Sequence, residues 1–89
     1  LMLKPGQAGM LDDSAKLHYL RVINDSRCPQ DAQCVWAGEV NIELMLESGK
    51  GNQTFTMKDD RKAVNVLDYT IELTLVDRNH LIQVKHTKY

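Results

Sequence analysis

The chain has 89 residues, of which 43% are hydrophobic and 26% charged, with a formal net charge of −1. This is the composition of a single globular domain covering residues 1–89, and it excludes a disordered chain and a membrane-spanning helix. Because acidic and basic residues are scattered along the chain, the sequence also lacks the basic patch expected of a nucleic-acid-binding protein or a polybasic membrane anchor.

The first predicted elements are two strands, at 8–11 and 15–24. The second is rich in aromatic and β-branched residues, which favour extended chain. Leu17 and Tyr19 share one face of it, whereas Leu20 falls on the other face. This imperfect alternation predicts either a β-bulge or a strand that is covered on both faces.

The clearest period-two pattern predicts a strand at 39–47. The residues expected to face inward are Val40, Ile42, Leu44 and Leu46. Those expected to face outward are Asn41, Glu43, Met45 and Glu47. A loop of about five residues at 48–52 and a strand at 53–58 complete a predicted hairpin.

The last predicted strands lie at 69–77 and 81–87, and a turn at 78–80 joins them. The side chains of the first that are expected to face inward are Tyr69, Ile71, Leu73 and Leu75. The β-branched residues of 61–69 favour extended chain over a helical turn. Six to seven short strands predict an all-β fold, either a small antiparallel β-sandwich (Ig-like) or a partly open barrel.

Cys28 and Cys34, the two cysteines, are separated by the residues PQDAQ. Structural zinc sites usually have four ligands and cysteine pairs two to four residues apart, and thioredoxin-like chemistry uses Cys-x-x-Cys at the start of a helix. The spacing here fits neither pattern and favours a local disulfide, which would stabilise the fold by roughly 2.3 kcal/mol. A structural disulfide indicates an oxidising compartment, so we expect an exported protein whose signal segment is absent from this chain.

The residues around the cysteines predict a rigid loop. Asp25 and Ser26 readily hydrogen-bond to nearby backbone amides and so initiate turns, and Pro29 fixes φ after the first cysteine. We expect Trp36 to anchor the structure by packing on the end of the sheet or on the disulfide. Gly38 is expected to allow a bulge or a close approach of two backbone segments.

Three motifs carry a family resemblance: LKPGQ at 3–7, DSRCP at 25–29 and CVWAG at 34–38. In this order, and followed by an alternating strand, they resemble a family of small, uncharacterised bacterial exported proteins. Many members look like lipoproteins that are tethered through a cysteine preceding the domain. The resemblance implies a β-sandwich in the periplasm or cell envelope, but no activity. It covers the first half of the chain, since the second half matches only as generic strands.

Residues with catalytic or metal-binding chemistry are dispersed along the sequence. His18, His80 and His86 show no metal-binding spacing, and the serines lack a Gly-x-Ser-x-Gly context. The adjacent carboxylates at 12–13 and 59–60 lie in predicted turns, where neighbouring side chains point apart. We therefore expect no catalytic residues, no cofactor, no metal and no enzymatic activity.

One function open to this chain is that of a non-enzymatic extracytoplasmic domain that binds a protein or cell-envelope component through the disulfide-closed loop. The exposed contact residues of the loop would be Arg27, Gln30, Asp31 and Gln33. A rigid loop loses little conformational entropy on binding. The same loop could instead serve only to close the end of the sandwich.

The alternative function is that of a periplasmic domain handling copper or zinc. Its ligands would come from the three histidines and from Met2, Met10, Met45 and Met57. Thioether ligands suit Cu(I), but these methionines form no Met-x-Met cluster. Neither function involves nucleic acid, contact with a membrane would require a lipid anchor outside this chain, and exposed strand edges could pair into a homodimer.

Overall fold

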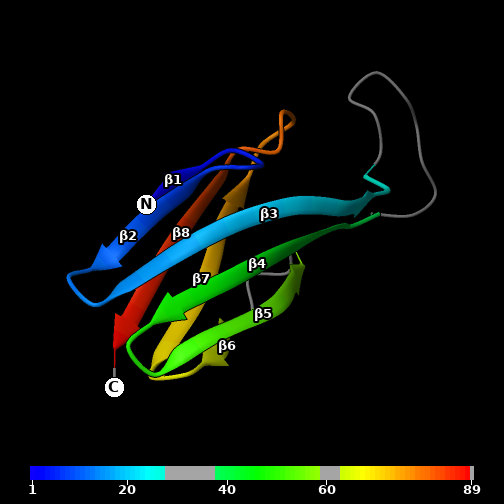
Figure 1. Cartoon of the computed structure of the whole chain (residues 1–89). Coiled ribbons are helices and arrows are strands. Elements are labelled where there is room, and N and C mark those ends of the chain that lie inside the picture. Colours follow the sequence, from blue (N-terminus) through cyan, green and yellow to red (C-terminus); the bar gives the residue numbers. More distant parts are fainter. Residues whose placement is uncertain (28–37, 59–62, 89) are drawn as a thin grey trace.

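The computed structural model describes residues 1–27, 38–58 and 63–88, which form eight strands (Figure 1). One sheet contains, in spatial order, β2 (Ala8–Asp12), β3 (Ala15–Asp25), β4 (Val40–Ser48) and β5 (Gly51–Lys58). The other contains β1 (Met2–Leu3), β8 (Ile82–Lys88), β7 (Tyr69–Val76) and β6 (Ala63–Val66). The described residues include no helix of the length and apolarity needed to cross a membrane.

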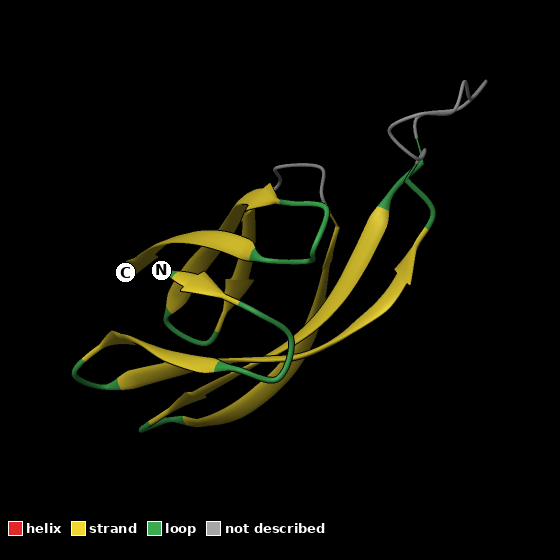
Figure 2. Ribbon diagram, turned by 90° about the horizontal axis from the view of Figure 1, so that it is seen from above, coloured by secondary structure: helices red, strands yellow, loops and turns green. Residues whose placement is uncertain are grey.

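The two sheets lie face to face as a β-sandwich, which confirms the predicted all-β fold (Figure 2). All neighbouring strands are antiparallel. Each sheet keeps two free edges, so the strands do not close into a barrel. Four consecutive strands, β2 to β5, build one sheet as a meander, whereas immunoglobulin domains interleave their strands between the two sheets. The sequence-based prediction did not include β1, whose two residues are too few to show an alternating pattern.

The core lies between the sheets and is built from their alternating apolar side chains. In β4, Val40, Ile42, Leu44 and Leu46 are all fully buried, as the period-two pattern predicts. The other buried apolar residues are Leu3, Leu11, Ala15, Leu17, Tyr19, Met57, Val66, Tyr69, Ile71, Leu73, Val76, Ile82 and Val84. Burial of this apolar surface is the main force that holds the two sheets together.

β3 contains two bulges, which explain its imperfect alternation. Its pairing with β4 shifts register between Tyr19 and Arg21 and again between Val22 and Asn24. Each shift inserts one extra residue, so the strand can return to the core face after it. Val22 therefore packs against the core, while the two inserted residues, Leu20 and Ile23, are exposed.

One core position predicted in β7, Leu75, is wrong. The alternation places Leu75 inward, but the structure exposes 44% of it and buries Val76 instead. The reason is a register shift between Leu73 and Leu75 in the pairing of β7 with β8, which inserts Thr74 and reverses the faces that follow.

The hairpin between β4 and β5 is tighter than the predicted loop of about five residues. Ser48 pairs with Gly51, so only Gly49 and Lys50 form the turn. Gly51 has φ of 122°, a conformation open to glycine but not to most other residues. With this conformation at Gly51, β5 begins two residues earlier than the sequence pattern indicates.

Candidate functional site

The segment singled out by the sequence leaves the sandwich at the end of β3 and returns at the start of β4. Residues 28–37 lie outside the described residues, and with them Cys28, Gln30, Asp31, Gln33, Cys34 and Trp36. The structure therefore leaves the disulfide and most of the predicted contact residues as predictions. It does describe the two short chain segments that carry this loop, residues 25–27 and 38–39, which we call the stem.

Ser26 and Glu39 close the stem. The Ser26 amide donates to the carbonyl oxygen of Glu39 at 2.8 Å, and the Ser26 hydroxyl donates to the same oxygen at 3.0 Å. In return, the Glu39 amide donates to Ser26 Oγ at 3.1 Å. These bonds continue the β3–β4 ladder one step beyond the last strand pair, Asp25 with Val40.

Gly38 makes the close backbone approach that the sequence predicts. Its φ is 68°, in the left-handed region that favours glycine. A Cβ atom at this position would overlap the carbonyl oxygen of Ser26 and lie 2.8 Å from the Cα atom of Arg27. Any side chain here would therefore push the two segments of the stem apart.

Asp25 and Arg27 form a fork-to-fork ion pair inside the stem. Arg27 donates from its amide and Nε to Asp25 Oδ1, both at 3.0 Å, and from Nη2 to Oδ2 at 2.8 Å. Charge-assisted bonds of this bidentate kind are stronger than neutral ones. They hold the pKa of Asp25 well below its ordinary value, with the Arg27 side chain as the largest cause.

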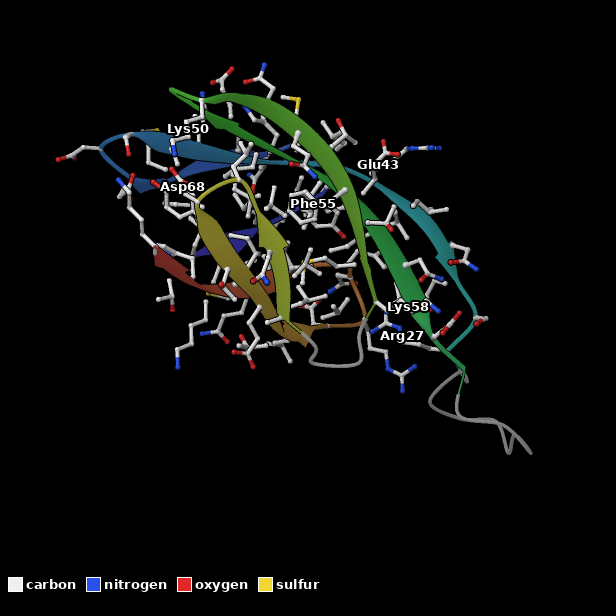
Figure 3. The ribbon with its side chains drawn as sticks, turned by 90° about the horizontal axis from the view of Figure 1, so that it is seen from below. Arg27, Glu43, Lys50, Phe55, Lys58 and Asp68 are labelled. Carbon is white, nitrogen blue, oxygen red and sulfur yellow. The ribbon has the colours of Figure 1, made fainter. Side chains whose placement is uncertain are left out.

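The same guanidinium joins the stem to the opposite sheet. Arg27 Nη1 donates to the carbonyl oxygen of Val76 at 3.0 Å, and Nη2 donates to that of Asp77 at 3.0 Å. Both carbonyls lie where β7 ends and the turn to β8 begins. Arg27 was expected to be an exposed contact residue, and this expectation is wrong: only 16% of its side chain is exposed, because the guanidinium turns back onto the β7–β8 turn (Figure 3).

His80 completes the connection from the other side. It lies in the predicted turn between β7 and β8, and its Nε2 is 2.8 Å from Asp25 Oδ2. Asp77 holds this turn by accepting bonds from the amides of Asn79 and Leu81 at its Oδ1. His80 itself has φ of 66°, so the turn presents its ring toward the stem. The described part of the stem is thus fixed to both sheets.

The sequence carries a partial signal for this arrangement. An Asp followed by Arg-Asn-His is typical of a side-chain-capped turn, so the role of Asp77 could have been found. The pairing of Asp25 with His80 could not, because the two residues are 55 positions apart.

A cleft of about 180 Å³ lies at the opposite end of the sandwich, between the β2–β3, β4–β5 and β6–β7 turns. It is lined by Ser14, Ser48, Gly49, Lys50, Asp68, Tyr69 and Lys88. An ion pair of 2.7 Å between Lys50 and Asp68 connects the two sheets across it (Figure 3).

Next to this cleft, the Tyr69 hydroxyl donates to Asp12 Oδ2 at 2.7 Å, while the amide and hydroxyl of Ser14 donate to Asp12 Oδ1. These bonds lower the pKa of Asp12 to about 2, and the bond from Tyr69 has the largest effect. A carboxylate with so low a pKa is a weak general base near neutral pH. The cluster is therefore better suited to holding the sheets together than to activating the Ser14 hydroxyl.

The three histidines lie on three different elements. His18 is on the outer face of β3, His80 in the β7–β8 turn and His86 on β8, where its ring is 6.4 Å from that of Tyr69. Within residues 1–27, 38–58 and 63–88, no group of three or more His, Cys, Asp or Glu side chains is placed to hold a metal ion.

The four methionines are spread over three places: Met57 is in the core, Met10 and Met45 are on the outer face of the β2–β5 sheet, and the exposed Met2 is on β1 of the other sheet. Met57 is buried, so it is not available to a surface site. Met45 lies directly opposite His18 in the β3–β4 register, and Met10 lies on the neighbouring strand opposite Lys16. Among the described residues, His18 Nε2 has no hydrogen-bond partner, and its nearest carboxylate oxygen, Glu47 Oε1, is 3.8 Å away.

Comparison with known proteins finds no matching family model, no matching curated protein and no matching solved structure. The family resemblance of the three motifs therefore stays a prediction.

Proposed function

We propose that this chain is a non-enzymatic extracytoplasmic binding domain, which contacts a protein or cell-envelope component through residues 28–37. The observation that carries the proposal is the anchoring of the stem by Arg27, which bonds to Asp25 on its own sheet and to the Val76 and Asp77 carbonyls of the other sheet. Anchored in this way, the two ends of the loop lose little freedom when a partner binds.

A loop that only connects two strands would not need this anchoring. Hairpin strands can be joined by two residues, as β4 and β5 are here. Residues 28–37 are a longer insertion, and their ends are held by Gly38, Ser26 and a charged network. Loops presented on a rigid scaffold are common sites of recognition.

The contact surface consists of the loop and the adjoining end of β3. Because Arg27 is committed to the stem, recognition falls to Gln30, Asp31 and Gln33. The exposed apolar side chains of Leu20 and Ile23 lie on the same strand as the stem and extend this surface toward the sandwich. Exposed apolar side chains beside a polar loop are typical of protein-binding surfaces.

The extracytoplasmic location rests on the cysteines and on the three motifs. A disulfide between Cys28 and Cys34 would persist only in an oxidising compartment. It would also restrict the conformations open to the loop, in addition to the anchoring of the stem. A lipid anchor, as the family resemblance implies, would hold the domain at the cell envelope.

The proposal is tested by chemical cross-linking in intact cell envelopes, followed by purification of the domain and identification of the cross-linked partner. We expect a partner whose recovery falls at least tenfold in an Asp31→Ala, Gln33→Ala double variant. The matched control is Asp13→Ala, Gln83→Ala, which removes the same side-chain types from exposed positions elsewhere. Equal recovery with both double variants would refute the role of the loop.

A second candidate function is the binding of a soft metal ion such as Cu(I) by Met10, His18 and Met45. Two observations favour it. His18 Nε2 has no hydrogen-bond partner among the described residues, and Met45, which carries a thioether, lies directly opposite His18 in the β3–β4 pairing. Imidazole and thioether ligands both suit Cu(I).

Native mass spectrometry of the purified protein with Cu(I), or with Ag(I) as its stable substitute, tests this candidate. We expect one ion to be retained by the wild type and by a His86→Ala control, and lost in His18→Ala. Retention by His18→Ala, or no retention by the wild type, would exclude the proposed ligands.

A further inference from the structure

Among the described residues the sandwich has four free sheet edges, and they differ in how well they are protected against pairing with another chain. β1 and β6 are short, with two and four residues, and β2 is interrupted by a register shift between Met10 and Asp12. β5 is eight residues long, and its pairing with β4 runs without a shift from Lys58 to Gly51. Short strands and bulges are the usual means of protecting an edge, and β5 has neither.

The side chains of β5 leave the edge open as well. Residues 51–57, GNQTFTM, include no charged residue and no proline. Natural proteins often place lysine or proline on exposed edges to prevent strand addition. In β5 the only charge is on Lys58, the last residue of the strand. Every second residue of such an edge directs its N–H and C=O groups away from β4, so these groups are available to another strand.

Phe55 adds an apolar contact to this edge. It packs partly against the core but is not fully covered. Figure 3 shows it at the open side of the sandwich, between β5 of one sheet and β6 of the other. Covering an aromatic ring at the edge would add apolar burial to the backbone hydrogen bonds of strand addition.

We propose that β5 pairs antiparallel with β5 of a second copy of this chain, which joins the two β2–β5 sheets into one continuous sheet. A two-fold axis through such a pair must place opposed residues on the same face. Residue numbers of opposed pairs must then add to an even number, so the axis passes through a residue. The two registers that keep the greatest length of β5 paired have the axis at Phe55 or at Thr54.

The charges favour the register centred on Phe55. It places Lys58 opposite Asn52 of the partner subunit, on the same face as Glu47 of the partner subunit. The register centred on Thr54 would instead bring Lys58 opposite Lys50 of the partner subunit, and like charges directly opposed are destabilising. In the favoured register Thr54 lies opposite Thr56 of the partner subunit, a pair of β-branched residues that suits a sheet, and the two Phe55 rings meet.

Sedimentation equilibrium from about 1 μM to about 1 mM covers the range of tight to very weak association. We expect the wild-type mass to rise from 10.1 kDa to twice that value with concentration. A Thr54→Lys, Thr56→Lys variant should stay monomeric, because it places lysines opposite lysines while both sites are exposed in the single chain. The control is Gln83→Lys, Thr87→Lys, with the same added charge on exposed positions of β8, and it should dimerise like the wild type.

A charge-swap experiment keeps the test independent of folding. Mixing the Thr54→Lys, Thr56→Lys variant with a Thr54→Glu, Thr56→Glu variant should produce a heterodimer, although each alone is monomeric. A wild type that stays monomeric at the highest concentration would overturn the proposal. Dimerisation of the lysine variant to the same extent as its control would also overturn it, since the association would then use another surface.

Discussion

Replacing Arg27 by alanine tests the anchoring of the stem most directly. The substitution removes the donors to the Val76 and Asp77 carbonyls, and within the described part of the chain it leaves the Asp25 carboxylate with His80 as its remaining side-chain partner. We expect the folded state to lose stability because two partly buried carbonyls and a charged group lose their hydrogen bonds.

The size of the loss follows from the geometry. A hydrogen bond in which one group is charged contributes about 1.5–3 kcal/mol when its partner is buried, and less when water can replace it. Arg27 is 16% and Asp25 25% exposed, so water can replace only part of the network. We expect Arg27→Ala to lower the free energy of unfolding by about 2–3 kcal/mol, which in a domain of this size corresponds to a fall in Tm of about 10–20 °C.

Urea unfolding and thermal melts of Arg27→Ala and Arg21→Ala provide the comparison. Arg21 is also on the β3 side of the molecule and also pairs with a carboxylate, Glu43, but 65% of its side chain is exposed. Because this ion pair is on the surface, Arg21→Ala should lower the free energy of unfolding by less than about 1 kcal/mol. If the two variants lost the same stability within about 0.5 kcal/mol, the argument that Arg27 ties the stem to the β7–β8 turn would be refuted.

Three further predictions concern the stem, the bulge in β7 and acid stability. Gly38→Ala should lower the free energy of unfolding, measured in urea, by about 2 kcal/mol or more. The new side chain would have to adopt a positive φ, and its Cβ atom would overlap the Ser26 carbonyl oxygen. An unchanged free energy would contradict the close approach of the two backbone segments. Urea unfolding should show that Leu73→Ala lowers the free energy of unfolding by about 2–5 kcal/mol, because Leu73 is buried, whereas the exposed Leu75→Ala changes it by no more than about 0.5 kcal/mol. Equal losses would contradict the bulge. Because the pKa of Asp25 is lower in the folded chain than its ordinary value of 3.8, the unfolded chain takes up the proton first. Stability from this group is therefore complete above about pH 5 and declines as the pH falls toward 2, and Asp25→Asn should flatten this part of the stability curve.

Local patterns were sufficient to predict most of the strands. In β4 the side chains alternate strictly, and every residue predicted inward is buried, because a regular strand turns successive side chains to opposite faces. The turn at 78–80 was also predicted from local sequence, because side chains such as those of Asp and Asn hydrogen-bond to nearby backbone groups and so favour turns. The close approach at Gly38 was also predictable, because only glycine tolerates it without strain.

Only the tertiary structure decided what the bulges and the charged residues do. The inserted Thr74 exposes Leu75 and buries Val76, and a bulge depends on how two strands pair rather than on the sequence of one. Arg27 looked like an exposed contact residue because nothing near it in sequence indicates a partner in the other sheet. Its carbonyl acceptors lie about 50 residues away, as the separations of 49 and 50 positions show. The sequence alone determined an all-β fold with a specialised loop. Contacts between distant segments determined that the strands form a sandwich and that the stem of this loop is anchored to both sheets.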